Sequence, residues 1–383
     1  MHALEHKIQT IENELLEMSF GYQGLKLTGE KASLSNRMQY YNVPSISIAL
    51  VSDYAIEWAN GYGITRAGTD TLITSGTIFE AASTTKTITA AIALHYVDHG
   101  LLSLDEDINR FLKSWQVPEN GFTQQNKVTL RFLLSHQAGF PMTNYGYDEK
   151  VGFPTLVQVL QGEFPADNKA AQVEFVPGSD WQYSNVGYDV IQLLLEDQLS
   201  KPFAQIVQET ILDPLNMKSS TMDYPLTPKM QRREAIPHDD RGVAREPFMH
   251  PTALAHGGLM TTPTDLAKFV IELMLAYQGQ SSRLLSQQSS QQMFTKILEL
   301  DPAQTGGLSG SGGLGVLLRG EGVGLSFLHP GINFPGTTCW LEGYPGSGKG
   351  SVIMANGNKG LLLTSEILTT ITSIEEENGT FTG

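Results

Sequence analysis

Residues 79–90 read Phe-Glu-Ala-Ala-Ser-Thr-Thr-Lys-Thr-Ile-Thr-Ala, a run of small residues that leads into a predicted helix. The helix is expected from Thr84 to Tyr96, because apolar residues recur there at roughly helical spacing. Ser83 and Lys86 are three positions apart, so a helix that starts here brings the hydroxyl and the amine to one face. Free backbone N–H groups and the positive dipole at a helix start also favour developing negative charge. The stretch therefore predicts a nucleophile beside a base, the Ser-x-x-Lys pattern of acyl transfer through a covalent ester. The alternative is a helix cap followed by a solvated lysine.

The overall composition is that of an acidic, soluble globular protein. The chain has 383 residues, enough for two lobes or for one large domain with an insertion. It carries 25 Lys and Arg against 40 Asp and Glu, a formal net charge of −15, and it has no basic stripe. Nucleic acid is therefore not expected as a partner, and the oligomeric state stays open.

The sequence contains few of the residues that form disulfides or metal sites. Cys339 is the single cysteine, which excludes an intramolecular disulfide and a metal site built on cysteines. The nine histidines include no His-Glu-x-x-His pattern and no close ligand cluster. We therefore expect neither a metal nor another cofactor.

Membrane and export signals are also missing from the sequence. No segment approaches about 18 consecutive apolar residues, so no membrane span is expected. The first residues, 1–7, lack the basic and then apolar pattern of a signal peptide. We expect a cytoplasmic protein, or an exported one whose leader is absent from this chain.

Strand-like patterns gather toward the two ends of the chain, and helical patterns lie between them. The segments with strand character are 43–51, 55–62, 77–79, 314–318, 324–328, 337–344 and 350–355. The segments with helical character are 2–18, 128–136, 186–199, 202–211 and 361–374, together with one that begins near 262. Thr129 is the expected cap of the second of these, and Thr262 or Thr264 caps the last.

This distribution predicts an α+β fold, with an antiparallel sheet flanked by the terminal helices and a mostly helical lobe beside it. The sheet lobe is expected to be discontinuous, from 1–96 and 250–383, and the helical lobe from 97–249. A small-molecule substrate is expected to bind in the cleft between the two lobes.

Two further patches accompany the Ser-x-x-Lys stretch. Tyr183-Ser184-Asn185 precedes the predicted helix at 186–199, and His329-Pro330-Gly331 follows a predicted strand. With these three patches in this order, the chain resembles the serine β-lactamase and penicillin-binding-protein superfamily, and most of all its class C-related esterases, D-amino peptidases and carboxypeptidase-like hydrolases. The likeness runs from about residue 40 to about residue 375. It also includes the segments 133–139, 213–217 and 257–266.

The resemblance implies a role for each matching position. Ser83 would be the nucleophile, and Lys86 would be kept partly neutral so that it can take the serine proton. Tyr183 would share the proton relay and help to activate the leaving group or the attacking water.

The remaining implied positions bind the substrate. Asn185 would orient the substrate and hold Lys86, although it is also a candidate cap for the helix that follows. In the third patch, Gly331 precedes Ile332, and the backbone N–H groups of Ser83 and Ile332 would form the oxyanion hole.

His329 is a departure from the pattern of many β-lactamases and transpeptidases, which place Lys-Thr-Gly at the third patch. A histidine is mostly neutral at neutral pH and attracts a substrate carboxylate poorly. The His-x-Gly form therefore favours esters or amides that lack that carboxylate.

Several nearby residues have a structural and a functional interpretation. His136, which sits in Ser-His-Gln-Ala-Gly, is interpreted as structural. Trp181, Phe334 and Trp340 are candidates for an apolar acyl pocket, with core packing as the alternative. The loops at 140–170 and 220–250 are expected to set the pocket shape, 303–313 to form a flexible loop, and Gly-Ser-Gly-Lys-Gly at 346–350 a hairpin turn rather than a phosphate loop.

The sequence thus predicts a metal-free serine hydrolase that works through an acyl-enzyme on small carboxylic esters or on D-amino acid peptides and amides. The alternative within enzymes is a class C-like β-lactamase or a D-alanyl-D-alanine carboxypeptidase. A non-catalytic penicillin-binding sensor or scaffold is the alternative outside them.

Overall fold

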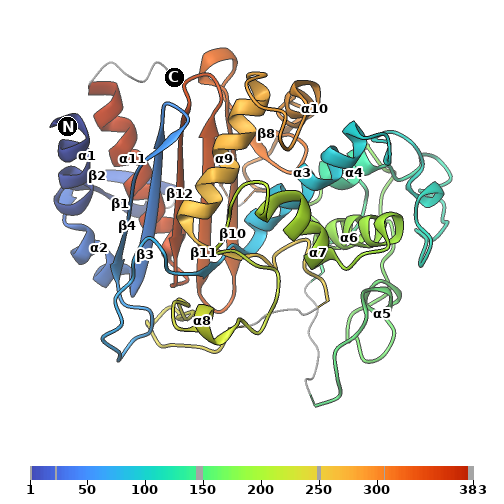
Figure 1. Cartoon of the computed structure of the whole chain (residues 1–383), viewed down its shortest axis with the longest axis horizontal. Coiled ribbons are helices and arrows are strands. Elements are labelled where there is room, and N and C mark those ends of the chain that lie inside the picture. Colours follow the sequence, from blue (N-terminus) through green and yellow to red (C-terminus); the bar gives the residue numbers. More distant parts are fainter. Residues whose placement is uncertain (1, 22–23, 144–149, 248–251, 306, 378–383) are drawn as a thin grey trace.

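An eight-stranded antiparallel sheet runs through the computed structural model, which describes residues 2–21, 24–143, 150–247, 252–305 and 307–377 (Figure 1). The strand order is β4-β3-β12-β11-β10-β9-β8-β7. The strands are β3 (Ser45–Ser52), β4 (Ala55–Gly63), β7 (Leu298–Leu300), β8 (Gly310–Gly312), β9 (Leu317–Arg319), β10 (Ser326–Asn333), β11 (Thr337–Tyr344) and β12 (Lys349–Ala355). Because β3 pairs with β12, strands from early and late parts of the chain share one sheet, as predicted.

Helices cover both faces of this sheet. α9 (Pro263–Tyr277) packs on β3, β4, β11 and β12, and α11 (Gly360–Glu377) packs on β11 and β12 from the other side (Figure 1). Because α9 and α11 cover its two faces, β11 is buried along almost its whole length and does not show the alternation of apolar and polar residues that a half-exposed strand has. The Thr262 hydroxyl accepts the N–H of Asp265 and caps α9, which selects between the two caps that the sequence allowed. The predicted α+β class with its antiparallel sheet is confirmed.

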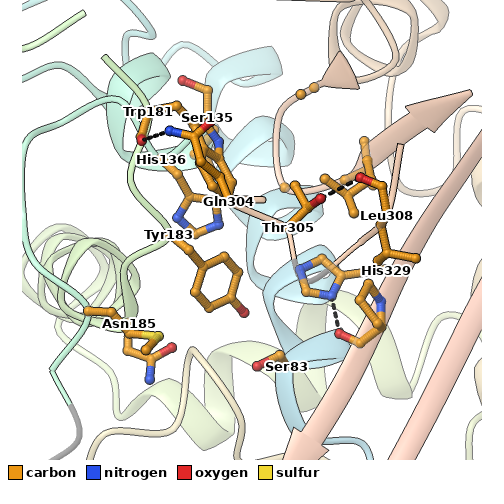
Figure 2. A pocket seen from close by; sticks show the side chains of 18 of the residues that line it. Ser83, Ser135, His136, Trp181, Tyr183, Asn185, Gln304, Thr305, Leu308 and His329 are labelled. Carbon is orange, nitrogen blue, oxygen red and sulfur yellow. Dashed lines mark hydrogen bonds between the residues drawn. The ribbon is translucent and has the colours of Figure 1, made fainter. Parts of the chain in front are cut away.

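A second group of helices lies beside the sheet. α3 (Thr85–Asp98) is buried over residues 85–94, and the other members are α4 (Leu130–Leu134), α5 (Leu156–Gln161), α6 (Asn185–Leu199) and α7 (Phe203–Val207), which a π-helical turn (Gln208–Leu212) continues. The Thr129 hydroxyl accepts the N–H of Phe132 and caps α4, as predicted. Smaller elements in this part of the molecule are α8 (Pro228–Gln231), α10 (Gln287–Met293) and the short pair β5 (Phe79–Glu80) and β6 (Met260–Thr261). The chain enters α3 through the turn that carries Ser83, at the edge of the pocket drawn in Figure 2.

The division into lobes at 97 and 249 stays a prediction. Its second boundary, at 249–250, lies outside the described residues. Within the described part of the chain, no helix combines the length and the apolar character that crossing a bilayer requires.

The N-terminal segment differs from the predicted helix at 2–18. α1 (His2–Asn13) ends early, and β1 (Leu15–Gly21) follows and pairs with β2 (Gly24–Ala32). The N–H of Leu16 donates to Thr370 Oγ1 at 2.9 Å, and the N–H of Met18 donates to Glu366 Oε1 at 2.8 Å. Both acceptors come from α11, so partners about 350 positions away in the sequence override the local helical pattern.

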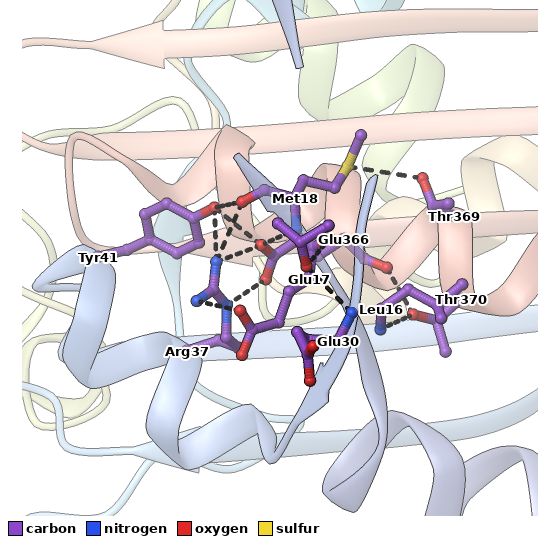
Figure 3. A network of polar contacts seen from close by, with 10 residues as sticks. Leu16, Glu17, Met18, Glu30, Arg37, Tyr41, Glu366, Thr369 and Thr370 are labelled. Carbon is purple, nitrogen blue, oxygen red and sulfur yellow. Dashed lines mark hydrogen bonds and ion pairs between the residues drawn. The ribbon is translucent and has the colours of Figure 1, made fainter. Parts of the chain in front are cut away.

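A buried ion pair joins this segment to the rest of the protein (Figure 3). Arg37, on α2 (Leu34–Tyr41), donates to both carboxylate oxygens of Glu366 at 2.8 and 2.5 Å. The Tyr41 hydroxyl donates to the same carboxylate at 2.8 Å. Arg37 and Glu366 are 5 % and 0 % exposed. One carboxylate therefore ties α2, β1 and α11 together.

Glu366→Gln is expected to destabilise the protein by about 3 kcal/mol, because it leaves the buried Arg37 charge with only the more distant carboxylate of Glu17, at 3.5 Å. Replacing both partners, as Arg37→Met with Glu366→Leu, is expected to cost less, since the buried Arg37 charge is removed together with the Glu366 carboxylate. Urea unfolding monitored by circular dichroism measures both effects. Equal losses in the single and double variants would show that packing, and not the charge pair, determines stability here.

Candidate active site

Ser83 lies in a tight turn, Ala82–Thr84, between β5 and α3. Ala82 has a φ of 49°, in the left-handed region that few residues other than glycine adopt. The Thr84 hydroxyl holds the turn by donating to the carbonyl of Ala81 at 2.7 Å, and it lies 3.5 Å from Cys339 Sγ on β11. Backbone strain that is held in this way often marks a functional position.

Lys86 lies one helical turn after Ser83 and is fully buried. Its Nζ donates to Ser83 Oγ at 3.2 Å and to the carbonyl of His256 at 2.8 Å. Burial lowers the pKa of Lys86 to about 7, and the negative charge of Asp189 opposes that change. A substantial fraction of Lys86 is therefore neutral at neutral pH and able to accept a proton.

Tyr183 approaches the same serine from the segment before α6. Its ring centroid is 4.8 Å from Lys86 Nζ. Burial raises the pKa of Tyr183 well above its usual value, and the nearby Ser83 hydroxyl opposes that change. The phenol is therefore protonated at neutral pH and able to donate. Figure 2 shows its hydroxyl directed toward Ser83.

The strand β10 passes close to the Ser83 turn. A Cβ added to Gly331 would lie 2.5 Å from the carbonyl oxygen of Ala81 and 3.2 Å from the backbone nitrogen of Ser83. Only glycine allows this approach, because a side chain would collide with backbone that cannot move away easily. Ile332, the next residue, is 43 % exposed and lines the pocket.

His329 precedes Pro330 and Gly331 on the same strand and is 5 % exposed. Its Nδ1 donates to the carbonyl of Pro330 at 2.6 Å, and its ring lies 6.4 Å from that of Tyr183. Burial, with the nearby charge of Lys86, lowers the pKa of His329 to about 3. The imidazole is therefore neutral, and with the proton on Nδ1 its Nε2 is an acceptor.

Asn185 is the first residue of α6 and lines the pocket. The helix cap is Ser184, whose hydroxyl accepts the N–H of Gly187 at 3.0 Å, so the expected cap at Asn185 is wrong. The hydrogen bonds of Lys86 Nζ run to Ser83 and His256 rather than to Asn185. Asn185 Oδ1 is buried without a hydrogen-bond partner among the described residues. The structure thus puts this amide at the pocket but does not attach it to Lys86.

The pocket has a volume of about 380 Å³ and opens in front of Ser83 (Figure 2). Residues from both the helical part and the sheet line it. Its apolar lining residues are Leu134, Met142, Trp181, Leu308, Val316, Leu317, Pro330, Ile332 and Phe334. Among the described residues that line it, none is Lys, Arg, Asp or Glu. The wall is therefore neutral and largely apolar.

Sequence reasoning did not place His136 at this pocket. His136 lines it and packs on Tyr183 with ring centroids 4.5 Å apart. Its Nδ1 accepts the N–H of Ser184 at 3.1 Å, so it also has the structural role that was predicted. Its φ of 60° is the unusual feature, and a sequence does not display dihedral angles.

The pocket walls also differ in part from the expectation. Trp181 and Phe334 line the pocket, whereas Trp340 is buried in the core cluster beneath α11. Of the described residues in the loop at 140–170, only Met142 lines the pocket, and none of those in the loop at 220–250 does. Residues 144–149 of the first loop and 248–250 of the second lie outside the described residues. Residues from the segment 303–313 contribute instead, and Gln304 Nε2 donates to the carbonyl of Trp181 at 3.4 Å. The prediction of a flexible loop over this whole segment is wrong at its end, because Gly310–Gly312 forms β8 and pairs with β7.

A metal site has no counterpart in the part of the chain that the structure describes. No three or more His, Cys, Asp or Glu residues gather there in a group that could hold a metal ion.

Comparisons with known proteins agree with this architecture. D-alanyl-D-alanine-carboxypeptidase/endopeptidase AmpH of Escherichia coli K12 is 26% identical over 248 residues, which are 63% of this chain and 61% of that protein. The Beta-lactamase of Lysobacter lactamgenus is 29% identical over 236 residues, 61% of this chain and 56% of that protein. The chain therefore spans little more than half the length of these curated relatives.

The solved structures show the same fold. D-amino acid amidase from Ochrobactrum anthropi SV3, complexed with L-phenylalanine amide, superposes with a TM-score of 0.70 at 23% identity, covering 90% of this chain and 97% of that one. The family model described as Beta-lactamase matches residues 31–367. This match takes in the Ser83 turn, Tyr183 and β10, and the chain belongs to the beta-lactamase family.

Proposed function

We propose that the protein is a serine hydrolase that forms an acyl-enzyme on Ser83, with small carboxylic esters or D-amino acid amides and peptides as substrates. The observation that carries the proposal is the fully buried Lys86 amine, 3.2 Å from Ser83 Oγ and with a pKa near 7. A solvated lysine after a helix cap, the alternative that the sequence left open, would have neither the burial nor this contact.

The proposed acylation uses three side chains. Lys86 takes the proton of Ser83 while Ser83 Oγ attacks the substrate carbonyl carbon. The backbone N–H groups of Ser83 and Ile332 bind the oxyanion, and the close approach of Gly331 to the Ser83 turn supports this pairing. As the carbon–oxygen or carbon–nitrogen bond breaks, Tyr183 donates its proton to the leaving group and regains one from Lys86.

Deacylation reverses the proton path. Water gives a proton to Tyr183 while Tyr183 passes its own proton to neutral Lys86, and the water oxygen forms a bond to the ester carbonyl carbon. The bond from that carbon to Ser83 Oγ then breaks, and Lys86 returns the proton to Ser83 as the acid leaves. Asn185 Oδ1 is buried at the pocket and has no hydrogen-bond partner in the described part of the chain, which supports a role as acceptor for a substrate N–H. Such an acceptor suits an amide or an amino ester.

The pocket chemistry supports an uncharged acyl group. Its described lining residues carry no charge, and His329 is neutral where many relatives place a lysine. Burying a substrate carboxylate there without a cation would be costly. Similarity to a D-amino acid amidase supports the amide branch of the proposal, and similarity to AmpH and a Beta-lactamase supports the carboxypeptidase and β-lactamase alternatives.

A three-substrate assay tests the proposal. The purified protein is given p-nitrophenyl butyrate, a chromogenic cephalosporin and a fluorescent penicillin. Continuous turnover of the ester, with slow or no cephalosporin hydrolysis, is expected. Rapid cephalosporin hydrolysis would favour the β-lactamase alternative, and stoichiometric penicillin labelling without turnover of any substrate would favour a sensor or scaffold. A panel of D- and L-amino acid amides then separates the two proposed substrate classes.

The activity is expected to fall on the acid side of about pH 7. Lys86 accepts a proton only when it is neutral, and its pKa is about 7. Below that pH, kcat/KM for the ester is expected to drop toward tenfold for each pH unit. On the alkaline side Tyr183 stays protonated, because its pKa is raised. A flat kcat/KM between pH 5.5 and pH 8.5 (roughly the range that spans the Lys86 titration) would contradict Lys86 as the base.

His329→Lys is expected to improve penicillin acylation relative to ester hydrolysis. A lysine at this position supplies the cation that a penicillin carboxylate needs, although its own burial beside Lys86 limits the gain to about tenfold. The rate constants of acylation by fluorescent penicillin and of ester hydrolysis give the ratio. His329→Gln, which has similar size and no charge, is the control. An unchanged ratio in His329→Lys would place residue 329 off the substrate path.

A further inference from the structure

The second turn of α6 carries a buried carboxylate that the proposed mechanism does not use. Asp189 is fully buried, and its Oδ1 lies 2.9 Å from His256 Nδ1. Since a carboxylate in such a place is costly unless it is paired, its retention in the core points to a specific task. Asp189 also lies close enough to influence the charge of Lys86.

The loop before β6, at residues 252–256, forms hydrogen bonds with both α6 and α3. On the α6 side, Gln192 Oε1 accepts the N–H groups of Leu254 and Ala255 at 2.8 and 3.1 Å, and its Nε2 donates to the carbonyl of Thr252 at 2.8 Å. Asp189 adds the bond to the His256 ring one turn earlier on the helix. The loop is therefore fixed to α6 by two side chains.

On its other side the same loop presents carbonyl groups to α3. The carbonyl of Ala255 accepts from Thr89 Oγ1 at 2.7 Å, and the carbonyl of His256 accepts from Lys86 Nζ at 2.8 Å. His256 thus meets Asp189 through its ring and Lys86 through its backbone. A displacement of its ring would move the carbonyl that orients the Lys86 amine.

We propose that Asp189 and His256 are positioning residues of the base: Asp189 holds the His256 ring, and the His256 carbonyl aims the Lys86 amine at Ser83. This inference rests on the proposed function, because it concerns the base of that same reaction. Asp189 has a second effect, since its negative charge favours the protonated form of Lys86. Asp189 and His256 together therefore set the direction of the Lys86 amine, and the charge of Asp189 sets the pH at which Lys86 becomes a base.

The other titratable groups around Lys86 do not duplicate that charge. They are Tyr183 and Tyr188, whose rings lie 4.8 and 5.6 Å from Nζ, His136 from the turn after α4, His329 from β10 and the His256 ring. Both tyrosines have a raised pKa, and His136 and His329 have a lowered one, so these four are neutral near pH 7. Asp189 is the carboxylate that acts on Lys86 among the described groups.

The test measures how fast a fluorophosphonate reacts with Ser83 as a function of pH. In this reaction the Ser83 Oγ–phosphorus bond forms, the phosphorus–fluorine bond breaks, fluoride leaves and Lys86 takes the serine proton. Asp189→Asn keeps an acceptor for His256 and removes the charge. In this variant, the pH at which the labelling rate falls on the acid side is expected to be about one unit lower, because Lys86 loses the anion that favours its protonated form.

A second variant tests the positioning role separately. His256→Phe keeps the backbone carbonyl and the ring volume and loses the bond to Asp189. It is expected to lower the plateau labelling rate about ten- to hundredfold, because the amine is no longer well aimed. Asp197→Asn is the matched control, since it makes the same change two turns further along α6, where Asp197 binds the N–H groups of Lys113 and Ser114. Its limb and plateau are expected to equal those of the wild type.

The outcomes separate this inference from the function on which it rests. If Asp189→Asn keeps the wild-type limb, or His256→Phe keeps the wild-type plateau, the positioning role is overturned while the labelled wild type still supports a serine hydrolase. If Asp189→Asn does not fold, His256→Phe decides alone. If the wild type and Ser83→Ala label to the same extent, the proposed function itself fails.

Discussion

Replacing Ser83 with alanine is expected to lower kcat for ester turnover by about 10⁶-fold. The variant removes the atom that forms the acyl bond, and the remaining binding groups retain only a small residual effect. Among the described lining residues, the other serine and threonine hydroxyls are already engaged. Ser135 is 1 % exposed and donates to the carbonyl of Arg131 at 2.8 Å, and Thr305 donates to the carbonyl of Leu308. Steady-state assays with p-nitrophenyl butyrate, with protein purified twice to exclude contaminants, measure the loss.

Ser35→Ala is the control for that substitution. Ser35 is an exposed serine on α2, remote from the pocket, and its loss is expected to leave kcat unchanged. Mass spectrometry adds a direct view, since brief acid quenching of the wild type with a slow ester or fluorophosphonate is expected to trap one acyl or phosphonyl group on Ser83. Turnover by Ser83→Ala at the wild-type rate would remove the nucleophile from the proposal.

Replacing Lys86 with methionine is expected to lower kcat/KM by about 10²- to 10⁴-fold, the range that a general base contributes. Methionine matches the length of lysine and suits a site with no exposure, so the loss should reflect the missing amine rather than a cavity. The acid limb near pH 7 is expected to disappear along with the rate, because the group that titrates there is gone.

The matched control for Lys86→Met is Lys218→Met, which changes an exposed lysine. A pH series of kcat/KM values, with circular dichroism to verify folding, completes the experiment. If Lys86→Met kept both the rate and the acid limb, another group would have to be the base. Retention of the limb with a reduced rate would also exclude Lys86 as its origin.

The fold class followed from the sequence because local patterns and tertiary contacts agree over most elements. The strand at 43–51, the pair at 337–344 and 350–355, and the caps at Thr129 and Thr262 all have local signals that packing does not override. Residues 15–18 are different, since their apolar spacing fits a helix as well as a strand. The choice is made by Thr370 and Glu366 on α11, which no local window includes.

The candidate site was only partly accessible from the sequence, for a similar reason. The motifs identified the residues around Ser83, but a motif does not reveal burial, and burial is what lowers the pKa values of Lys86 and His329. The contribution of His136 depends on a left-handed backbone angle. The contact between Asp189 and His256 joins residues 67 positions apart, and neither belongs to a recognisable pattern.

The single thiol of the chain gives this protein an internal reporter. Cys339 is fully buried, with Sγ 3.5 Å from the Thr84 hydroxyl under the Ser83 turn, and burial raises its pKa to about 12. An alkylating reagent therefore reaches it only when β11 separates from that turn. The rate of Cys339 alkylation under native conditions therefore measures how often β11 separates from the Ser83 turn. A ligand that binds in the pocket and stabilises this contact is expected to slow the alkylation.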